Sequence, residues 1–465
     1  MKFRPVVAIG ASWALLGLAA QAAGPARADI PLTSDDVAAL VQSTSATLAA
    51  RRADIEAAEA AVSEARVALW PRLVASGYYA RLSPITAPSL GNVVVAQSPG
   101  DITATNLPTA VPLRFAVPLD SAGIQLGATV PASDYLFRFP HTVAASRQAL
   151  STAQSQGDVA KSQTLSDARA LYYAWARAVL QKEVADTAVD QARAHLAFAH
   201  SREGVGTTTS TDALRAESQL ATAELLQLRL AHLIELLADQ LRTSMHDSRT
   251  ERYVVGETLD ATTASTTPDF TSCYEFAESH RSELSSLSAA IESEREQAKA
   301  ARAMMIPHLE LYGVILSSNP NTRYFPLEDK FHTTWEVGGR INYSPNELAL
   351  GRAQARQHRA RAESLIAQRQ QLLERIRDEV LAAVQARQES ALALTAAAKS
   401  LAVAEDSYRI RKSLFAEGRS ASVELTDAES DLVRARFAEV DARIDARLAS
   451  VRLEGAMGVL REPRH

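Results

Sequence analysis

The feature that most constrains this chain is a β-hairpin pattern set between two long helical patterns. Between Pro307 and Pro345, apolar and polar residues alternate in two runs, as in strands that have two different faces. Proline lacks an amide hydrogen and cannot continue a helix, so both prolines suit helix–strand junctions. In the second run, one face carries Trp335, Val337, Gly339, Ile341 and Tyr343.

The same block occurs earlier in the chain. The segment around Pro71 aligns with the segment around Pro307, 236 positions later. On the returning strand, Gly127 aligns with Gly338, 211 positions later, so the first hairpin has the longer loop. The pattern predicts a tandem duplication of a helix–strand–strand–helix–turn–helix unit. The expected divisions are a first repeat, a connector, a second repeat and a hairpin in each repeat: residues 29–250, 251–268, 269–465, 72–139 and 308–343.

Residues 1–28 have the pattern of a secretory signal peptide. Lys2 and Arg4 precede an apolar run, and small residues flank Arg27 at a cleavage site after Ala28. The apolar run is shorter than the ~20 residues that a membrane-spanning helix needs, which argues against an uncleaved anchor. We therefore expect export from the cytoplasm and cleavage after Ala28.

The remaining sequence predicts long helices joined by short turns. A capping pattern at Thr33 begins a helix that we expect to reach about Leu69. Glycine turns at Gly206 and Gly418 separate each later long helix from an antiparallel partner helix. Residues 83–121 are rich in proline, glycine, serine and threonine, so we expect an exposed loop without regular structure.

Composition and charge exclude several functions. The arginine-rich segment 352–377 is interleaved with acids, and the chain has a formal net charge of −5, so a solvated helix face is expected and a nucleic-acid partner is not. Cys273 is the single cysteine, so an internal disulfide is impossible. His195 and His200 are five positions apart, off the spacing of a helical metal pair. We expect no enzyme activity, cofactor or bound metal.

The number of strands predicts an assembly. One chain supplies four alternating strands, whereas membrane barrels of bacteria need eight or more. Open strand edges are not tolerated in lipid. The hairpins therefore either pack on a soluble protein surface or are pooled by several chains, and three chains would give twelve strands.

The arrangement resembles the TolC family of outer-membrane efflux proteins, the outer membrane factors. The resemblance rests on the duplicated unit, on the helix–strand joints at Pro71 and Pro307, and on the turn around Gly418. It implies a mainly α fold with a small β part. It also implies a homotrimer whose hairpins form a twelve-stranded barrel in outer-membrane lipid, continued by an α-helical periplasmic barrel.

The resemblance also implies sites. Glu424 and Asp427 match the acidic residues of the family's channel constriction. They are three apart and so share a helix face, where like charges would attract cations; the alternative is an ordinary solvated face near a helix N-terminus. The residues implied to contact an adaptor lie at the two turns: Gly204, Val205, Gly206, Thr207, Gly418, Arg419 and Ser420.

The aromatic residues Trp335 and Tyr343 lie on the apolar strand face. They are expected to be membrane-interface anchors, with ordinary sheet packing as the alternative.

The implied function is a passive exit channel of a tripartite efflux or type I secretion system. An inner-membrane transporter would pass substrates to it through a periplasmic adaptor, and the channel would sit in the outer membrane with a long periplasmic extension. The alternative is a periplasmic coiled-coil scaffold that transports nothing, whose hairpins pack on soluble protein.

Overall fold

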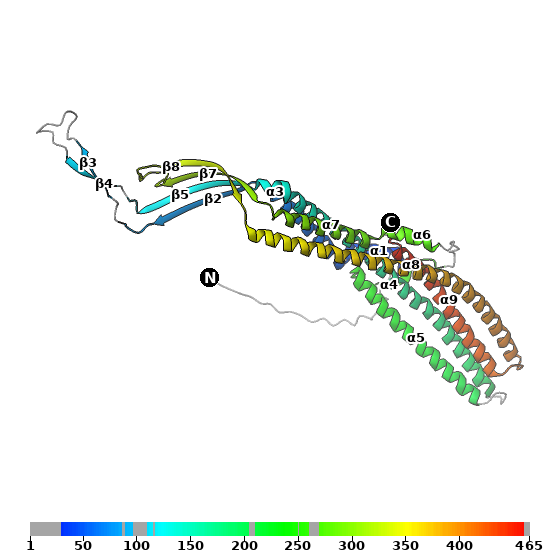
Figure 1. Ribbon diagram of the computed structural model, residues 1–465. Helices are drawn as coiled ribbons and strands as arrows, with labels where there is room; N and C mark the ends of the chain where they lie inside the picture. The colour runs from blue at the N-terminus through cyan, green and yellow to red at the C-terminus, as the bar shows by residue number, and fades with distance from the viewer. Residues whose placement is uncertain are drawn as a thin grey trace, which may run out of the picture.

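The computed structural model describes residues 29–85, 89–95, 109–114, 117–203, 210–249, 251–259 and 269–459. The expected signal peptide, residues 1–28, lies outside these ranges, and so do Gly204, Val205, Gly206 and Thr207 of the first turn. The molecule is elongated, with most of the strands at one end and the helices along the rest (Figure 1).

Helices make up most of the described chain. They are α1 (Ser34–Thr44), α2 (Ala46–Val67), α3 (Ala132–Phe137), α4 (Phe139–Glu203), α5 (Ser210–Met245), α6 (Phe270–His280), α7 (Ser282–Ala303), α8 (Pro345–Ala416) and α9 (Ser422–Ala456). None of the helices in the described ranges combines the length and the apolar character needed to cross a membrane.

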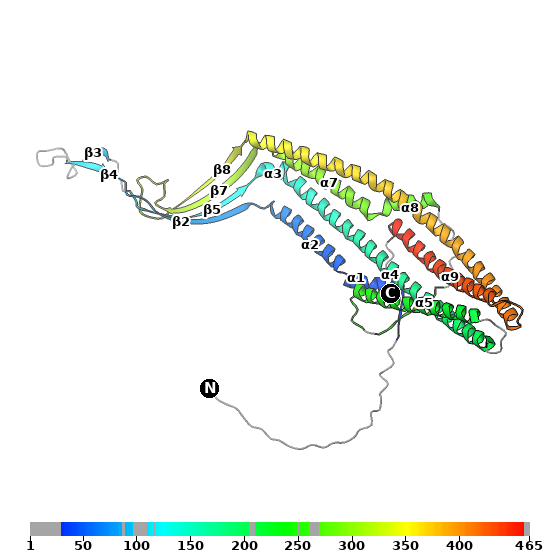
Figure 2. The same cartoon turned by 90° about the horizontal axis from the view of Figure 1, so that it is seen from below.

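The long helices form one layer, four helices wide at each level. Near the strands the neighbours are α2, α4, α7 and α8 in that order. Further from the strands they are α5, α4, α9 and α8. Helices α4 and α8 run through both levels. Helix α2 of the first level is succeeded by α5 in the second, and α7 by α9 (Figures 1 and 2). One side edge of the layer is therefore formed by α2 and α5, and the other by α8.

Two strand pairs, β2 (Arg72–Arg81) with β5 (Asp120–Val130) and β7 (His308–Asn319) with β8 (His332–Asn342), build the main sheet. The sheet is antiparallel, in the order β2-β5-β7-β8. Strands β5 and β7 join the two hairpins, with Leu126 opposite Ile315. Strands β2 and β8 are its outer strands, so the edges of the sheet continue the edges of the helix layer.

The expectation of an unstructured loop at residues 83–121 is wrong for part of that segment. Strands β3 (Ser89–Val95) and β4 (Thr109–Arg114) form a two-stranded ribbon beyond the main sheet (Figure 1). Val93 lies opposite Val111, and β-branched residues favour a pleated ribbon over a coil. The six prolines between residues 83 and 121 favour a loop and so mask the strand signal of this short run.

The first helix is also shorter than expected. The capping box at Thr33 confirms the predicted start: its Oγ1 accepts from the Asp36 N–H at 3.1 Å, and the Asp36 carboxylate accepts from the Thr33 N–H at 3.0 Å. The chain then breaks at Ser45, whose backbone is extended and whose Oγ accepts a 3.5 Å hydrogen bond from the Leu48 N–H. Hydroxyl side chains compete for backbone groups, which explains why a new helix begins there.

A small second sheet lies where the helix layer changes partners. Strand β1 (Ile30–Leu32) pairs in parallel with β6 (Tyr253–Val255), which falls within the expected connector 251–268. Beside it, Trp175 and Tyr172 are fully buried in the largest apolar core of the described chain. The pairing of segments more than 200 residues apart leaves no local signal in the sequence.

Candidate channel wall and helical tip

The main sheet has one apolar and one polar face. Directly opposite residues in neighbouring strands share a face, so the pairs Leu126–Ile315, Gly313–Val337 and Leu309–Ile341 extend one apolar surface across three strands. This surface is uncovered: the exposed fraction is 75% for Val337 and 72% for Ile341. Such a contiguous apolar face is typical of a surface that meets lipid or another chain.

The opposite face is polar and carries a charged network. The Arg323 guanidinium lies 2.6 Å from the Glu336 carboxylate, and Arg340 lies over the Tyr312 ring at 5.2 Å. Tyr312 in turn covers Gly338, where an added Cβ would come within 2.7 Å of the tyrosine hydroxyl. The glycine is therefore required by the close approach of the tyrosine across the strand pair.

Trp335 and Tyr343 lie near the two ends of the apolar face, and both are exposed, at 72% and 58%. Eight residues of strand separate them, which corresponds to roughly 26 Å. That span is close to the ~25 Å apolar band of outer-membrane barrels.

The joint between sheet and helices contains a polar cluster that the sequence does not reveal. Asp134 of α3 is buried and forms an ion pair with Arg138 at 2.6 Å. His308, the first residue of β7, lies 3.3 Å from Asp134 and 3.6 Å from Glu347 of α8. Three elements far apart in sequence are thus tied at one point. Only the proline beside His308 marks this place in the sequence.

The second tip lies between α8 and α9. Gly418 has a φ of 75°, and the Arg419 N–H donates to the Leu414 carbonyl at 2.8 Å, which closes the end of α8. Ser420 then donates from its hydroxyl to the Glu424 carboxylate at 2.6 Å. Gly418, Arg419 and Ser420 therefore form a tight turn, in which Gly418 and Arg419 are exposed and Ser420 is half-buried.

Glu424 and Asp427 are both exposed on the first turns of α9, as their spacing predicts. Glu424 also forms an ion pair with Arg411 of α8. The Ser420 hydrogen bond, and next the charge of Arg411, hold the pKa of Glu424 below its usual value. The described residues show no such partner for Asp427. The structure thus brings both acids to one helix face but gives them different surroundings.

A buried pair joins the two helical hairpins just behind this tip. The Nδ1 atom of His195, in α4, lies 3.0 Å from the Glu429 carboxylate of α9. Both side chains are almost completely buried. The Ser422 hydroxyl lies 3.3 Å from the His195 Nε2, and the Gln219 amide donates to Glu429 at 3.4 Å. From the sequence, His195 is predicted to be an ordinary helix residue, because its partner Glu429 is 234 positions away. No group of side chains within the described ranges could hold a metal ion.

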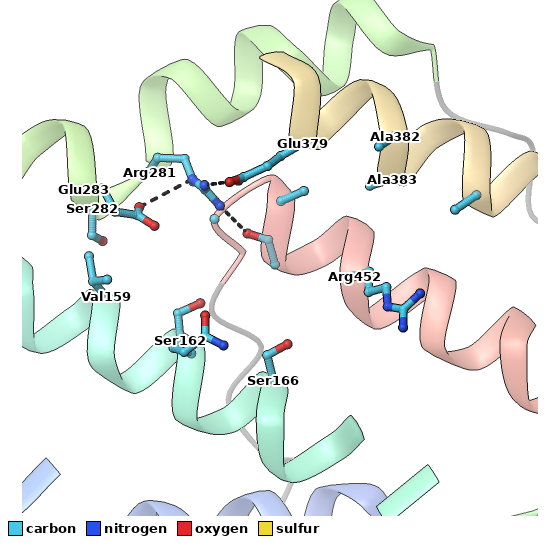
Figure 3. Close-up of a pocket in the computed structure, with 15 residues that line it drawn as sticks. Val159, Ser162, Ser166, Arg281, Ser282, Glu283, Glu379, Ala382, Ala383 and Arg452 are labelled. Carbon is cyan, nitrogen blue, oxygen red and sulfur yellow. Dashed lines mark hydrogen bonds and ion pairs between the residues drawn. The ribbon is translucent and has the colours of Figure 1, made fainter. Parts of the chain in front are cut away.

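A cavity of about 560 Å³ lies where α7 begins and α9 ends (Figure 3). Arg281 crosses its edge and donates to the Gly455 carbonyl at 3.0 Å, while its guanidinium pairs with Glu379 at 2.5 Å and Glu283 at 3.4 Å (Figure 3). Arg281 therefore holds the end of α9 next to the start of α7 and to α8. Ser162 and Ser166 of α4 line the other side.

Solved structures with this fold are outer-membrane channels and related proteins. The channel CusC is 14% identical, with a TM-score of 0.74 over 92% of this chain and 93% of CusC. The outer membrane protein VceC of Vibrio cholerae is 16% identical, with a TM-score of 0.72 over 91% of this chain and 96% of VceC. The CmeC outer membrane channel of Campylobacter jejuni is 14% identical, with a TM-score of 0.72 over 93% of this chain and 87% of CmeC. The fold is therefore that of TolC-like channels.

The sequence agrees with the fold. Residues 274–459 match the family described as "Outer membrane efflux protein". This match covers the second half of the chain, and the fold similarity extends over the rest. No curated protein matches the chain.

Proposed function

We propose that three copies of this chain form an outer-membrane exit channel, with twelve strands in a closed barrel and the helix layers continuing it as a periplasmic tunnel. The observation that carries the proposal is the pair of open edges. Strand β2 and helices α2 and α5 form one edge, and β8 and α8 form the other. Different surfaces that meet head to tail close into a ring under cyclic symmetry.

The apolar face of the sheet supports a position in lipid. Unpaired strand edges cannot face lipid, so β8 of one copy would pair with β2 of the next. The apolar row that includes Val337 and Ile341 would then face outward around the barrel. Trp335 and Tyr343 would lie at its two interfaces as anchors, and the polar network of Glu336 and Arg340 would face the lumen.

The distal end of the tunnel would hold the constriction and the adaptor contacts. Three-fold symmetry would bring together six carboxylates from Glu424 and Asp427 around a narrow opening. The exposed turn of Gly418, Arg419 and Ser420 would meet the tips of a periplasmic adaptor, together with the first turn at residues 204–207.

Energy and substrate choice would come from an inner-membrane transporter, with this chain as a passive conduit. Each repeat, residues 29–250 and 269–465, would supply half of every copy's wall. The family is one of channels rather than enzymes, which supports this division of labour.

Cell fractionation with cross-linking tests the proposal. The channel requires a trimer in the outer-membrane fraction that survives mild detergent, and stepwise conductance when it is added to a planar bilayer. A monomer released with the soluble periplasmic proteins would contradict it. That result would favour the alternative of a coiled-coil scaffold without a transport function.

A further inference from the structure

A row of arginines at the start of α8 has no role in the chain's own packing. Arg352, Arg356 and Arg359 are exposed, and no carboxylate in the described ranges forms an ion pair with them. The spacing of four and then three residues places them on one flank of the helix. The sequence pattern alone predicts only a solvated face here. The position of the row relative to the sheet indicates a surface that binds another molecule.

The packing of α8 against α7 fixes how the helix is turned. Gly351, Ala355 and Ala362 are buried on the side that faces the layer, and an added Cβ on Gly351 would come within 2.8 Å of the Ala301 carbonyl. The opposite side, which forms the open edge, carries three exposed alanines seven residues apart: Ala353, Ala360 and Ala367.

The arginine row occupies the flank that continues the apolar face of the sheet. Glu347 contacts His308, which belongs to the polar face of β7, and so marks the flank on the lumen side. Arg356 is nine residues from Glu347, which is about 180° around the helix. Arg352 and Arg359 fall within a turn on either side of Arg356. The row therefore faces the same way as Val337 and Ile341, away from the polar face.

The row also lies just beyond the apolar band. Tyr343 ends the band and α8 begins at Pro345. Arg352, Arg356 and Arg359 are seven, eleven and fourteen residues further, or about 10, 16 and 21 Å along the axis. Arg352 can reach the headgroups directly, and the other two come within about a Debye length of them when their side chains extend toward the membrane. The headgroup layer of a bilayer is roughly 5–8 Å thick on each side, and arginine side chains extend toward it along their alkyl stems. Arg302, exposed in the last turn of α7, lies at the same height because Ala301 packs on Gly351.

We propose that Arg352, Arg356 and Arg359, together with Arg302, bind the headgroups of anionic phospholipids at the periplasmic surface of the membrane. The inference rests on the proposed function, because it requires the apolar band to lie in a bilayer. A guanidinium offers paired donors that match the geometry of a phosphate. A neighbouring copy is the less suitable partner, since the edge it would cover carries the alanines and the arginines lie on the outer flank.

The experiment measures which lipid surrounds the channel. Purified trimer is placed in vesicles of phosphatidylcholine and phosphatidylglycerol, in which one lipid or the other has brominated chains that quench tryptophan on contact. Trp70, which is 75% exposed and lies at the helix–strand joint next to the start of β2, reports the contact. At low salt, phosphatidylglycerol is expected to be preferred about fivefold or more, since each arginine near an anionic surface contributes a factor of about five.

Two variants with the same loss of charge separate the row from the rest of the helix. The variant R352Q/R356Q/R359Q is expected to lose most of the preference. The control R361Q/R375Q/R377Q is expected to keep it, because Arg361 lies on the lumen flank and the other two lie more than about 20 Å beyond Arg359 along the axis by the helical rise. A lysine variant at the three positions keeps the charge and should retain most of the effect.

Several outcomes would overturn the inference. An unchanged preference in the glutamine variant would do so, as would loss of the trimer in that variant alone, which would assign the row to the contact between copies. A preference in the wild-type protein that does not fall as salt is raised would also contradict it. Wild-type protein that forms trimers but never enters the vesicles would instead contradict the proposed function.

Discussion

At the scale of single residues, Glu424 and Asp427 show how far a sequence match reaches. Both acids lie on one exposed face of α9, as their spacing predicts. Only Glu424 is held by Arg411 and by the Ser420 hydroxyl within the described chain. Two residues with the same expected role therefore have different freedom to move.

The first prediction concerns the charge at the tip. In a reconstituted channel, replacing Glu424 and Asp427 by alanine should lower the preference for cations, because the negative charges that attract them are lost. Measured reversal potentials in a salt gradient would show this. The matched control removes the same number of charges far from the tip, by alanine at the exposed Asp54 and Glu56 of α2. Equal ion selectivity in the variant and the wild-type channel would refute the carboxylate ring.

The pH dependence follows from the lowered pKa of Glu424. A carboxyl whose pKa is depressed stays charged above that pKa and loses its charge only as the pH falls through it. Removing the Ser420 hydroxyl removes the largest cause of the depression. The Ser420→Ala channel should therefore lose cation preference at a higher pH than the wild-type channel does. Identical pH profiles of the two would contradict this account.

The buried pair behind the tip gives a third prediction. His195→Ala removes the partner of a buried carboxylate, which typically costs about 1–3 kcal/mol. The variant should unfold at a lower temperature, and its tip should be cut faster by a protease. His232→Ala, at an exposed position on α5, should change neither property. A His195→Ala protein as protease-resistant as the wild type would show that the pair does not hold the hairpins together.

At the scale of elements, the period of each strand and helix is the best-predicted property of this protein. Strand β8 alternates as its sequence predicts, with Val337 and Ile341 exposed on one face. Helix α8 ends just before Gly418, the glycine turn that the sequence predicts. Short elements were not predicted: the ribbon of β3 and β4 and the sheet of β1 and β6 depend on pairings that have weak local signals or none.

The fourth prediction tests the apolar face of the sheet. Val337→Arg should prevent assembly in the membrane, because an arginine near the middle of the apolar band of a barrel costs about 2–4 kcal/mol per copy. The yield of detergent-resistant trimer in the outer-membrane fraction measures it. Gln125→Arg, on the polar face of β5, is the matched control and should assemble normally. If both variants assembled equally well, lipid would not face Val337.

At the scale of the whole molecule, one layer with two unlike open edges runs from the strands to the distal helices (Figure 2). The edges stay on the same sides throughout, because β2 leads back to α2 and β8 leads on to α8. A lone copy leaves strand edges and an apolar face uncovered, and both favour association.

The last prediction separates the ribbon from this assembly. Replacing residues 86–116 by a short glycine–serine turn should leave trimer yield unchanged. The strand ends are held without the ribbon: Asp120 binds Arg81 at 2.6 Å and Tyr79 at 2.9 Å, and the Leu82 N–H donates to the Leu119 carbonyl at 2.7 Å. Loss of trimer on native gels would show that the ribbon takes part in assembly.

The sequence by itself determined the repeating order of elements, the two faces of each hairpin and the spacing of the tip acids. These properties depend on the period of a helix or strand and on turn residues, which act over a few positions. The tertiary structure decided which elements are neighbours. The contacts of His195 with Glu429, of His308 with Asp134 and of Arg281 with Glu379 each join distant segments. Such contacts form only when packing of the helix layer brings the segments together, so no local pattern could predict them.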